Sequence, residues 1–179
     1  MKFYILGTDT AYTNYPKIEK WFGKIDPRDF NTRDAHRIPR RQLFTIHESE
    51  NTVFTSIIDN PFPLITAEVR DVFNMYEPHI IYKEIVLLDA KNEKAEAYYL
   101  PILEEIQCLN EESEYNLDRS IIKKGIIDYE KTEGKAIFRL GGFDHYYMVG
   151  RLDLVESVLK RRVKGVGLTE LGVYEGGQL

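Results

Sequence analysis

The sequence predicts an α+β fold, with a mainly antiparallel sheet or sheets packed against two principal amphipathic helices. Three observations lead to this expectation. Segments rich in β-branched and aromatic residues occur along the whole chain of 179 residues. Two other segments place apolar residues at helical spacing. Finally, the expected strands and helices follow one another in irregular order, without the strand–helix–strand rhythm of a parallel sheet.

The amino-terminal part predicts one strand followed by irregular chain. Lys2–Leu6 is a run of bulky residues typical of a strand. Thr8–Arg41 contains three prolines, each of which disfavours helix at the residue before it. Within it, Ile18, Trp21 and Phe22 stand at i, i+3 and i+4 and predict either one short helix or an aromatic plug.

A hairpin is predicted next. Gln42–Ile46 and Thr52–Ile58 have the β-branched and aromatic content of strands, and residues 47–51 suit the loop between them. A proline-containing turn follows at residues 59–63.

The first helix is predicted over Leu64–Glu77. Thr66 is the expected N-cap, and Pro78 stops the run. The apolar stripe that would face the core consists of Ile65, Val69, Val72, Phe73 and Tyr76.

The middle of the chain predicts further strands. Ile80–Asp89 and Glu96–Leu109 flank a charged turn, and Pro101 within the second run indicates an edge position or a bulge. Asn110–Arg119 is an acidic loop. Ile121–Tyr129 is compatible with a strand pair or a short helix.

The last part predicts a hairpin and the second helix. Lys135–Leu140 and His145–Val149 are the strands of the hairpin, around a glycine-rich turn. Asp153 and Glu156 have the spacing of a capping box, and Gly165 is the expected C-cap. The apolar face consists of Leu152, Val155, Val158, Leu159 and Val163. Residues 175–177 are expected to fray.

Composition excludes several function classes. The chain has 24 basic and 29 acidic residues, a formal charge of −5, which argues against a nucleic-acid partner. The one cysteine, Cys108, allows neither an internal disulfide nor a four-cysteine zinc site. No run approaches the roughly 20 apolar residues of a membrane span, and Phe3–Leu6 is too short for a signal-peptide core. We therefore expect no membrane partner and a reducing, cytoplasmic setting.

The sequence shows no motif of a catalytic, metal or cofactor site. The four histidines lack a ligand spacing, and there is no phosphate-binding loop. Cys108 lies in an apolar run and is expected to be a buried packing residue. Phe138 is expected in the core, and Arg139 on the opposite face of its strand. We therefore predict no catalytic residues, no cofactor and no metal.

Charge along the chain is polarised. Lys17–Arg41 has eight basic and four acidic side chains, whereas Glu104–Asp118 has acidic residues and no lysine or arginine. The acidic run is either a solvated loop or an electrostatic dock for a basic protein, in which Tyr115 would be an aromatic anchor. The partner-binding residues predicted on the second view are Glu104, Glu105, Glu111, Glu112, Glu114, Tyr115 and Asp118.

Several landmarks occur together in the second half. A Pro63–Ile65 lead into a helix precedes strands with Tyr98–Leu100, and Ala136–Leu140 is followed by a glycine turn and by Tyr147–Val149 running into the second helix. This order resembles the DUF1629 family, the Imm11-type immunity proteins of bacterial polymorphic toxin systems. The resemblance covers about Asp59–Leu168, so residues 59–179 would form a family-like α+β core and residues 1–58 a variable strand-rich region, together one compact domain.

The resemblance implies a non-enzymatic cytoplasmic protein that binds one cognate toxin domain and blocks it. It carries over no catalytic residues. The acidic run would complement the charge of a basic toxin, which is an inference from charge alone. Two alternatives remain open: an enzyme with an unrecognised small-substrate site, and an oligomeric adaptor.

Overall fold

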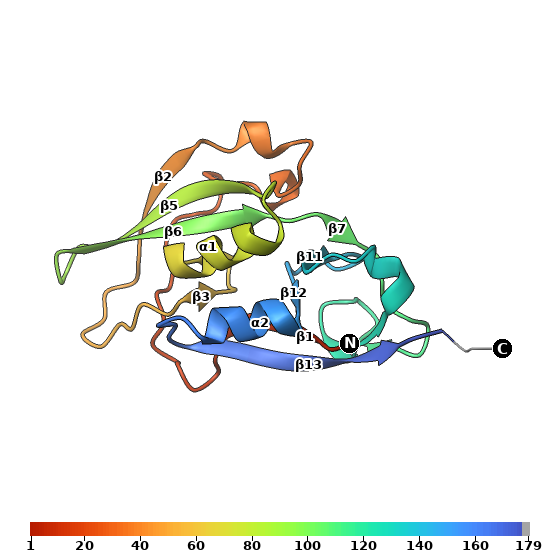
Figure 1. The fold of residues 1–179 in the computed structure, drawn as a ribbon. Helices are drawn as coiled ribbons and strands as arrows, with labels where there is room; N and C mark the ends of the chain where they lie inside the picture. The colour runs from red at the N-terminus through yellow and green to blue at the C-terminus, as the bar shows by residue number, and fades with distance from the viewer. Residues whose placement is uncertain (177–179) are drawn as a thin grey trace.

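Two mixed sheets enclose two helices that lie side by side (Figure 1). The computed structural model describes residues 1–176. It confirms the predicted α+β class, since most strand pairings are antiparallel. None of the helices in the described part of the chain is both long and apolar enough to cross a membrane.

The larger sheet has six strands. The pairs β10–β13 and β11–β7 are parallel, and the other three pairings are antiparallel. The order across the sheet is β10 (Ile126–Asp128), β13 (Val166–Tyr174), β1 (Phe3–Thr8), β12 (Met148–Arg151), β11 (Ile137–Leu140) and β7 (Glu105–Ile106).

The smaller sheet has five strands, and a two-stranded sheet stands apart from both. In the five-stranded sheet only β2–β5 is parallel. Its order is β2 (Arg41–Thr45), β5 (Ile81–Asp89), β6 (Lys94–Ile102), β4 (Leu64–Ile65) and β3 (Ile57–Ile58). The separate hairpin pairs β8 (Glu114–Tyr115) with β9 (Ile122–Lys124).

The helices connect the two sheets. α1 (Ala67–Tyr76) packs on β6, and α2 (Leu152–Leu159) packs on β1 and β12. The hydroxyl of Tyr76 joins the helices by donating to the carbonyl of Asp153 at 2.9 Å and lying 2.7 Å from the hydroxyl of Ser157. The 3-10 turns are η1 (Pro27–Asp29), η2 (Ala35–Arg37) and η3 (Tyr129–Thr132).

The six-stranded sheet contributes core residues from both of its faces, although much of β13 is exposed. Strand alternation sends Leu6 and Ile137 into the cluster that contains the helices and the five-stranded sheet, and Phe3 and Phe138 into a second cluster. Residues 106–127 supply part of that second cluster, which also buries Cys108. The predicted placement of Phe138 in the core is confirmed.

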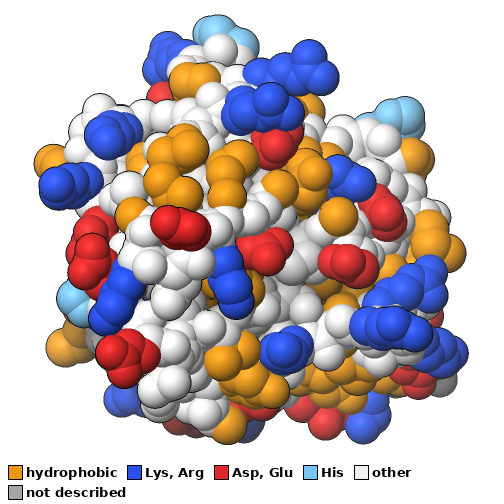
Figure 2. All heavy atoms as spheres, turned by 90° about the vertical axis from the view of Figure 1, so that its left-hand side faces the viewer, with side chains coloured by type: hydrophobic (Ala, Val, Ile, Leu, Met, Phe, Trp, Pro, Cys, Tyr) orange, Lys and Arg blue, Asp and Glu red, His pale blue; other side chains and the backbone are white. Residues whose placement is uncertain are grey.

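The surface is mixed in charge. On the face shown in Figure 2, acidic and basic side chains are interspersed, and hydrophobic side chains gather in its upper half. The turn that joins β5 to β6 projects on this side of the molecule (Figure 1). That face shows no large patch of a single charge, so it would not attract a strongly charged partner.

Several predicted elements are confirmed. β1, the β5–β6 hairpin and β11 lie where the sequence predicts strands, and α1 buries Val69, Val72 and Phe73. β12 pairs with β11 as predicted but begins at Met148, three residues later than expected. Residues 18–22 form no helix: Trp21 packs edge-on against Phe62 at 5.7 Å, whereas Phe22 is 87% exposed. Residues 121–129 contain two short strands, β9 and β10.

The hairpin predicted from Gln42–Ile46 and Thr52–Ile58 is wrong. β2 instead pairs in parallel with the nine-residue β5, and β3 pairs with β4. Strand content is a local property, but the partner is decided by burial. Thr55 is fully buried, and its carbonyl accepts a 2.8 Å hydrogen bond from the hydroxyl of Tyr98, so this segment packs under the sheet.

The predicted helix ends also differ. α1 starts at Ala67 and not at Leu64, because Leu64–Ile65 pairs as β4. Thr66 is the N-cap, as predicted, although its hydroxyl makes no capping bond. In α2 the N-cap is Arg151, and the carboxylate of Asp153 binds the Arg151 guanidinium at 2.8 Å, so the capping box is wrong.

The end of α2 and the chain after it differ as well. The helix ends at Leu159, so Gly165 is not its C-cap. Gly165, at φ 65°, instead begins the turn into β13, where an added Cβ would lie 2.5 Å from the Thr55 side chain. β13 occupies much of the carboxy-terminal chain for which the sequence predicted no regular structure. Fraying was predicted for residues 175–177, and residue 177 lies outside the described residues.

The strand predicted over Glu96–Leu109 is divided. β6 ends at Ile102 and the chain crosses to the other sheet as β7. β4 pairs with β6 only at Tyr99, so Pro101 lies where β6 has only β5 beside it in the described sheet, as its missing amide proton requires.

Candidate functional site

The segment Asn110–Lys124 forms a hairpin that leaves the six-stranded sheet between β7 and β10. Its strands β8 and β9 pair only with each other in the described structure. The segment lies on the right-hand side of Figure 1, near β11. It contains five of the seven residues predicted to bind a partner, and we refer to it as the 110–124 hairpin.

The two remaining acidic residues are engaged elsewhere. Glu104 lies 3.0 Å from the ammonium group of Lys135, which also contacts Glu77 at 3.6 Å. The hydrogen bond from Lys135 to Glu104 raises the pKa of this lysine, so it stays charged. With His79 these groups line a hollow of about 190 Å³. Glu104 therefore belongs to a local ion-pair network.

Glu105 is paired with Arg139. The distance between its carboxylate and the Arg139 guanidinium is 3.7 Å. That guanidinium also lies 4.6 Å from the centre of the Tyr146 ring. Arg139 thus points away from Phe138, as alternation predicts, and neutralises one of the predicted acidic residues.

Within the hairpin the charges are mixed. Glu114 of β8 lies opposite Lys124 of β9. Glu111 and Glu112 are exposed and form no ion pair within residues 1–176. The hydroxyl and backbone amide of Ser120 bind the carboxylate of Asp118 and lower its pKa. None of the four acidic side chains of the segment therefore loses its negative charge, and the lowered pKa keeps Asp118 ionised.

Apolar side chains project from the tip of the hairpin. Leu117 is fully exposed, at 107% of its reference area, and Ile121 is 59% exposed. Single exposed apolar residues are common on surfaces, but here two occur within five positions of one turn. We refer to Leu117 and Ile121 as the apolar knob. Tyr115, 36% exposed, adds an aromatic ring to the same hairpin.

The tip is held in place by hydrogen bonds. The Asn116 side chain accepts from the amide of Ile121 at 2.9 Å and donates to the hydroxyl of Ser120 at 2.7 Å. The hydroxyl of Tyr147 donates to the carbonyl of Ser120 at 3.1 Å, which attaches the tip to the chain beside β12. These bonds hold the backbone of the turn from which Leu117 and Ile121 project.

Tyr115 is locked by its neighbours. The Arg119 guanidinium stacks over the Tyr115 ring at 4.4 Å and donates to its hydroxyl. On the other side the ring meets the edge of Phe143, with centroids 6.0 Å apart. These contacts fix Tyr115 as an anchor of the hairpin while leaving a third of its surface free.

The cysteine and histidines considered for other chemistry are not part of the 110–124 hairpin. Cys108 is completely buried, and burial raises the pKa of its thiol to about 12, which makes it a packing residue. Burial also lowers the pKa of His145. His47 is exposed beside Glu19. The described residues contain no group of three potential metal ligands.

Sequence reasoning identified Tyr115 and the acidic residues of the hairpin but missed Leu117 and Ile121. The sequence does contain a sign of these exposed residues. Leu117 and Ile121 interrupt a polar, acidic segment that has no apolar periodicity, so neither is expected to pack in a core.

No protein-family model matches the chain, and no curated protein matches it significantly.

Proposed function

We propose that this protein binds another protein through the tip of the 110–124 hairpin, and that it is a non-enzymatic immunity protein that neutralises a cognate bacterial toxin domain. The observation that carries the proposal is a rigid hairpin with Leu117 entirely in solvent. The resemblance of residues 59–168 to Imm11-type immunity proteins supports the choice of partner.

The energetics favour such a surface for tight binding. Complete burial of a leucine side chain contributes about 1.5–3 kcal/mol. Because the Asn116 and Tyr147 hydrogen bonds already order the tip, little conformational entropy is lost when a partner binds. A tight inhibitor needs this kind of pre-organised anchor.

The acidic residues act at longer range. Glu111 and Glu112 stand on the same hairpin as the knob, and they would attract a basic partner and orient it before contact. A toxin that acts on a polyanion would have such a basic surface.

The first prediction concerns Leu117. The toxin domain is sought in the product of the gene directly upstream, and its dissociation constant is measured by surface plasmon resonance. Leu117→Ala is expected to weaken binding about 10- to 100-fold, because the buried side chain is lost. The free energy of unfolding should change by less than about 0.5 kcal/mol, since Leu117 contacts solvent.

Leu43→Ala is the matched control. Leu43 is 56% exposed on the edge strand β2 of the other sheet, and its replacement should leave the dissociation constant unchanged. An equal loss in both variants, or no binding by the unaltered protein, would reject the proposal.

The second prediction separates attraction from contact. Replacing Glu111, Glu112 and Glu114 by glutamine should slow association several-fold and flatten its dependence on salt, with little change in dissociation rate. Stopped-flow or biosensor kinetics at two ionic strengths provide the measurement.

Its control removes the same charge at the opposite end of the molecule. Glu48, Glu50 and Glu93 are exposed in the loops beside the β5–β6 turn. The corresponding triple glutamine variant should retain the normal salt dependence. If both triple variants behave alike, net charge and not the hairpin governs association.

A further inference from the structure

The irregular segment before β2 encloses a cavity that the proposed function does not use. Its volume is about 540 Å³, within the roughly 300–1,000 Å³ of small-molecule sites. All the residues lining it come from 21–39, between Trp21 and Pro39. The cavity is thus built by one contiguous part of the chain.

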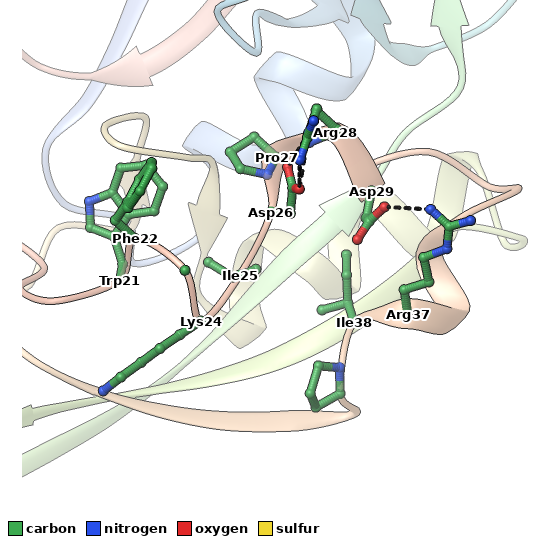
Figure 3. Close-up of a pocket in the computed structure, with 12 residues that line it drawn as sticks. Trp21, Phe22, Lys24, Ile25, Asp26, Pro27, Arg28, Asp29, Arg37 and Ile38 are labelled. Atoms are coloured by element: carbon green, nitrogen blue, oxygen red, sulfur yellow. Dashed lines mark hydrogen bonds and ion pairs between the residues drawn. The ribbon is translucent and has the colours of Figure 1, made fainter.

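The walls of the cavity differ in chemistry. In Figure 3, Trp21 and Phe22 stand at one end and the Asp29–Arg37 pair at the other, with Ile25 and Ile38 between them. Ile25 and Ile38 are 5% and 4% exposed, so they belong to the core and form a fixed apolar floor. The site therefore has an aromatic end, an apolar floor and a charged end.

The aromatic end is displayed by a tight turn. The amide of Lys24 donates to the carbonyl of Trp21 at 3.0 Å, and Gly23 has φ 78°, a left-handed conformation that glycine adopts without strain. The turn leaves Phe22 87% exposed, with its ring meeting Trp21 edge-on at 5.9 Å. An exposed phenylalanine beside a cavity offers a flat surface for a planar ligand.

The two arginines at the cavity are bound differently. Arg28 is held by Asp26, whose carboxylate contacts the Nε and Nη2 edge of the guanidinium at 2.7–3.1 Å. Arg37 has longer contacts, 3.4 Å to Asp29 and 3.6 Å to Asp34, and its side chain is 60% exposed. Strong charge-assisted bonds are about 2.7–2.9 Å, so Arg37 retains the capacity to bind an incoming anion.

The surroundings favour a negative ligand. Residues 17–41 have eight basic and four acidic side chains in a chain whose net charge is −5. Two of the four carboxylates, Asp26 and Asp29, line the cavity but each is paired with an arginine. The local excess of positive charge attracts anions to this part of the surface.

We propose that this cavity binds a small molecule with a planar aromatic body and one anionic group. The aromatic body would stack against Phe22 and Trp21 over the isoleucine floor, and the anion would accept hydrogen bonds from Arg37. The site lies in a different part of the chain from the 110–124 hairpin and does not depend on the toxin-binding proposal.

The single tryptophan provides the readout. Trp21 is the only tryptophan of the chain and lies in the cavity wall, so its fluorescence changes when a ligand binds there, and the variants below establish that the signal comes from this site. The probe is anilinonaphthalene sulfonate, an aromatic anion that accepts energy from tryptophan. Its uncharged counterpart, phenylnaphthylamine, is the matched ligand control. We expect one sulfonate per chain, bound at least about tenfold more tightly than the neutral probe.

Variants assign the interactions. Arg37→Gln should abolish the preference for the anionic probe, and Phe22→Ala should weaken both probes. Arg40→Gln removes an exposed arginine of the same segment that does not line the cavity, so it should change neither. Circular dichroism melting establishes that each variant is folded. Equal affinity for the two probes, or a preference that persists in Arg37→Gln, would overturn the proposal.

Discussion

Replacing Phe62 by alanine is expected to lower the free energy of unfolding by about 3–5 kcal/mol, as truncation of a buried aromatic ring does. Phe62 is 1% exposed. Its ring meets those of Trp21, Phe30 and Phe44 edge-on, at 5.7, 5.8 and 6.3 Å. Trp21 and Phe30 belong to the irregular segment and Phe44 to β2, so the variant would loosen that segment from the sheet.

The measurement is urea denaturation followed by circular dichroism, with Phe22→Ala as the control. Phe22 belongs to the same aromatic group but is 87% exposed, so its loss should change stability by less than about 0.5 kcal/mol. Trp21 fluorescence should shift to the red in Phe62→Ala as water reaches the indole. A loss below about 1 kcal/mol would show that Phe62 does not hold the segment in place.

The parts of the fold predictable from sequence are those decided by local pattern. The apolar stripe of α1 is continuous enough to outweigh other conformations, and the turn at residues 141–144 leaves the flanking strands β11 and β12 little choice of partner. In both cases neighbours in the sequence are also neighbours in the fold.

The errors arise where distant segments compete. β2 has a strand's composition, but it pairs with β5, whose partner residues lie 43 positions later, because that pairing buries Phe44 in the core. Arg151 takes the N-cap position of α2 because β12 runs directly into the helix, which places Asp153 in the first turn instead. Neither outcome has a signal in a short window of sequence.

The candidate site was predictable in the same limited sense. The acidic run marked the 110–124 hairpin, and Tyr115 lies on it. The sequence could not show that Lys135 and Arg139 fold back onto Glu104 and Glu105, since these partners are supplied by later strands. Nor could it show that the chain turns Leu117 outward.

β13 is the element that the sequence missed most completely, and its removal should have the largest effect. Glycines at 167 and 172 lower its strand propensity, yet it pairs with all six residues of β1 and in parallel with β10. An added Cβ at Gly167 would lie 2.8 Å from the carbonyl oxygen of Thr8, so the glycine permits close approach of the two backbones. A segment whose composition predicts little strand therefore forms the hydrogen-bonded strand between β1 and β10.

Deleting residues 166–179 is expected to abolish cooperative folding. The deletion would expose one edge of β1, detach β10 and uncover the second core cluster, which includes the 3%-exposed Leu171. These losses together exceed the about 5–15 kcal/mol by which domains are stable, and the free edge of β1 invites aggregation. Thermal and urea unfolding and a two-dimensional NMR spectrum of the shortened chain measure the effect.

Glu170→Ala in the full chain is the control, because it removes a side-chain ion pair of β13 and keeps the backbone pairing between β13 and β1. Glu170 pairs with Lys2 at 2.9 Å on the surface, and such exposed pairs contribute less than about 1 kcal/mol. This variant should therefore unfold almost as the unaltered protein does. A shortened chain that kept a sharp unfolding transition and dispersed NMR signals would mean that β1 is held by β12 alone, and that the six-stranded sheet does not need its longest member.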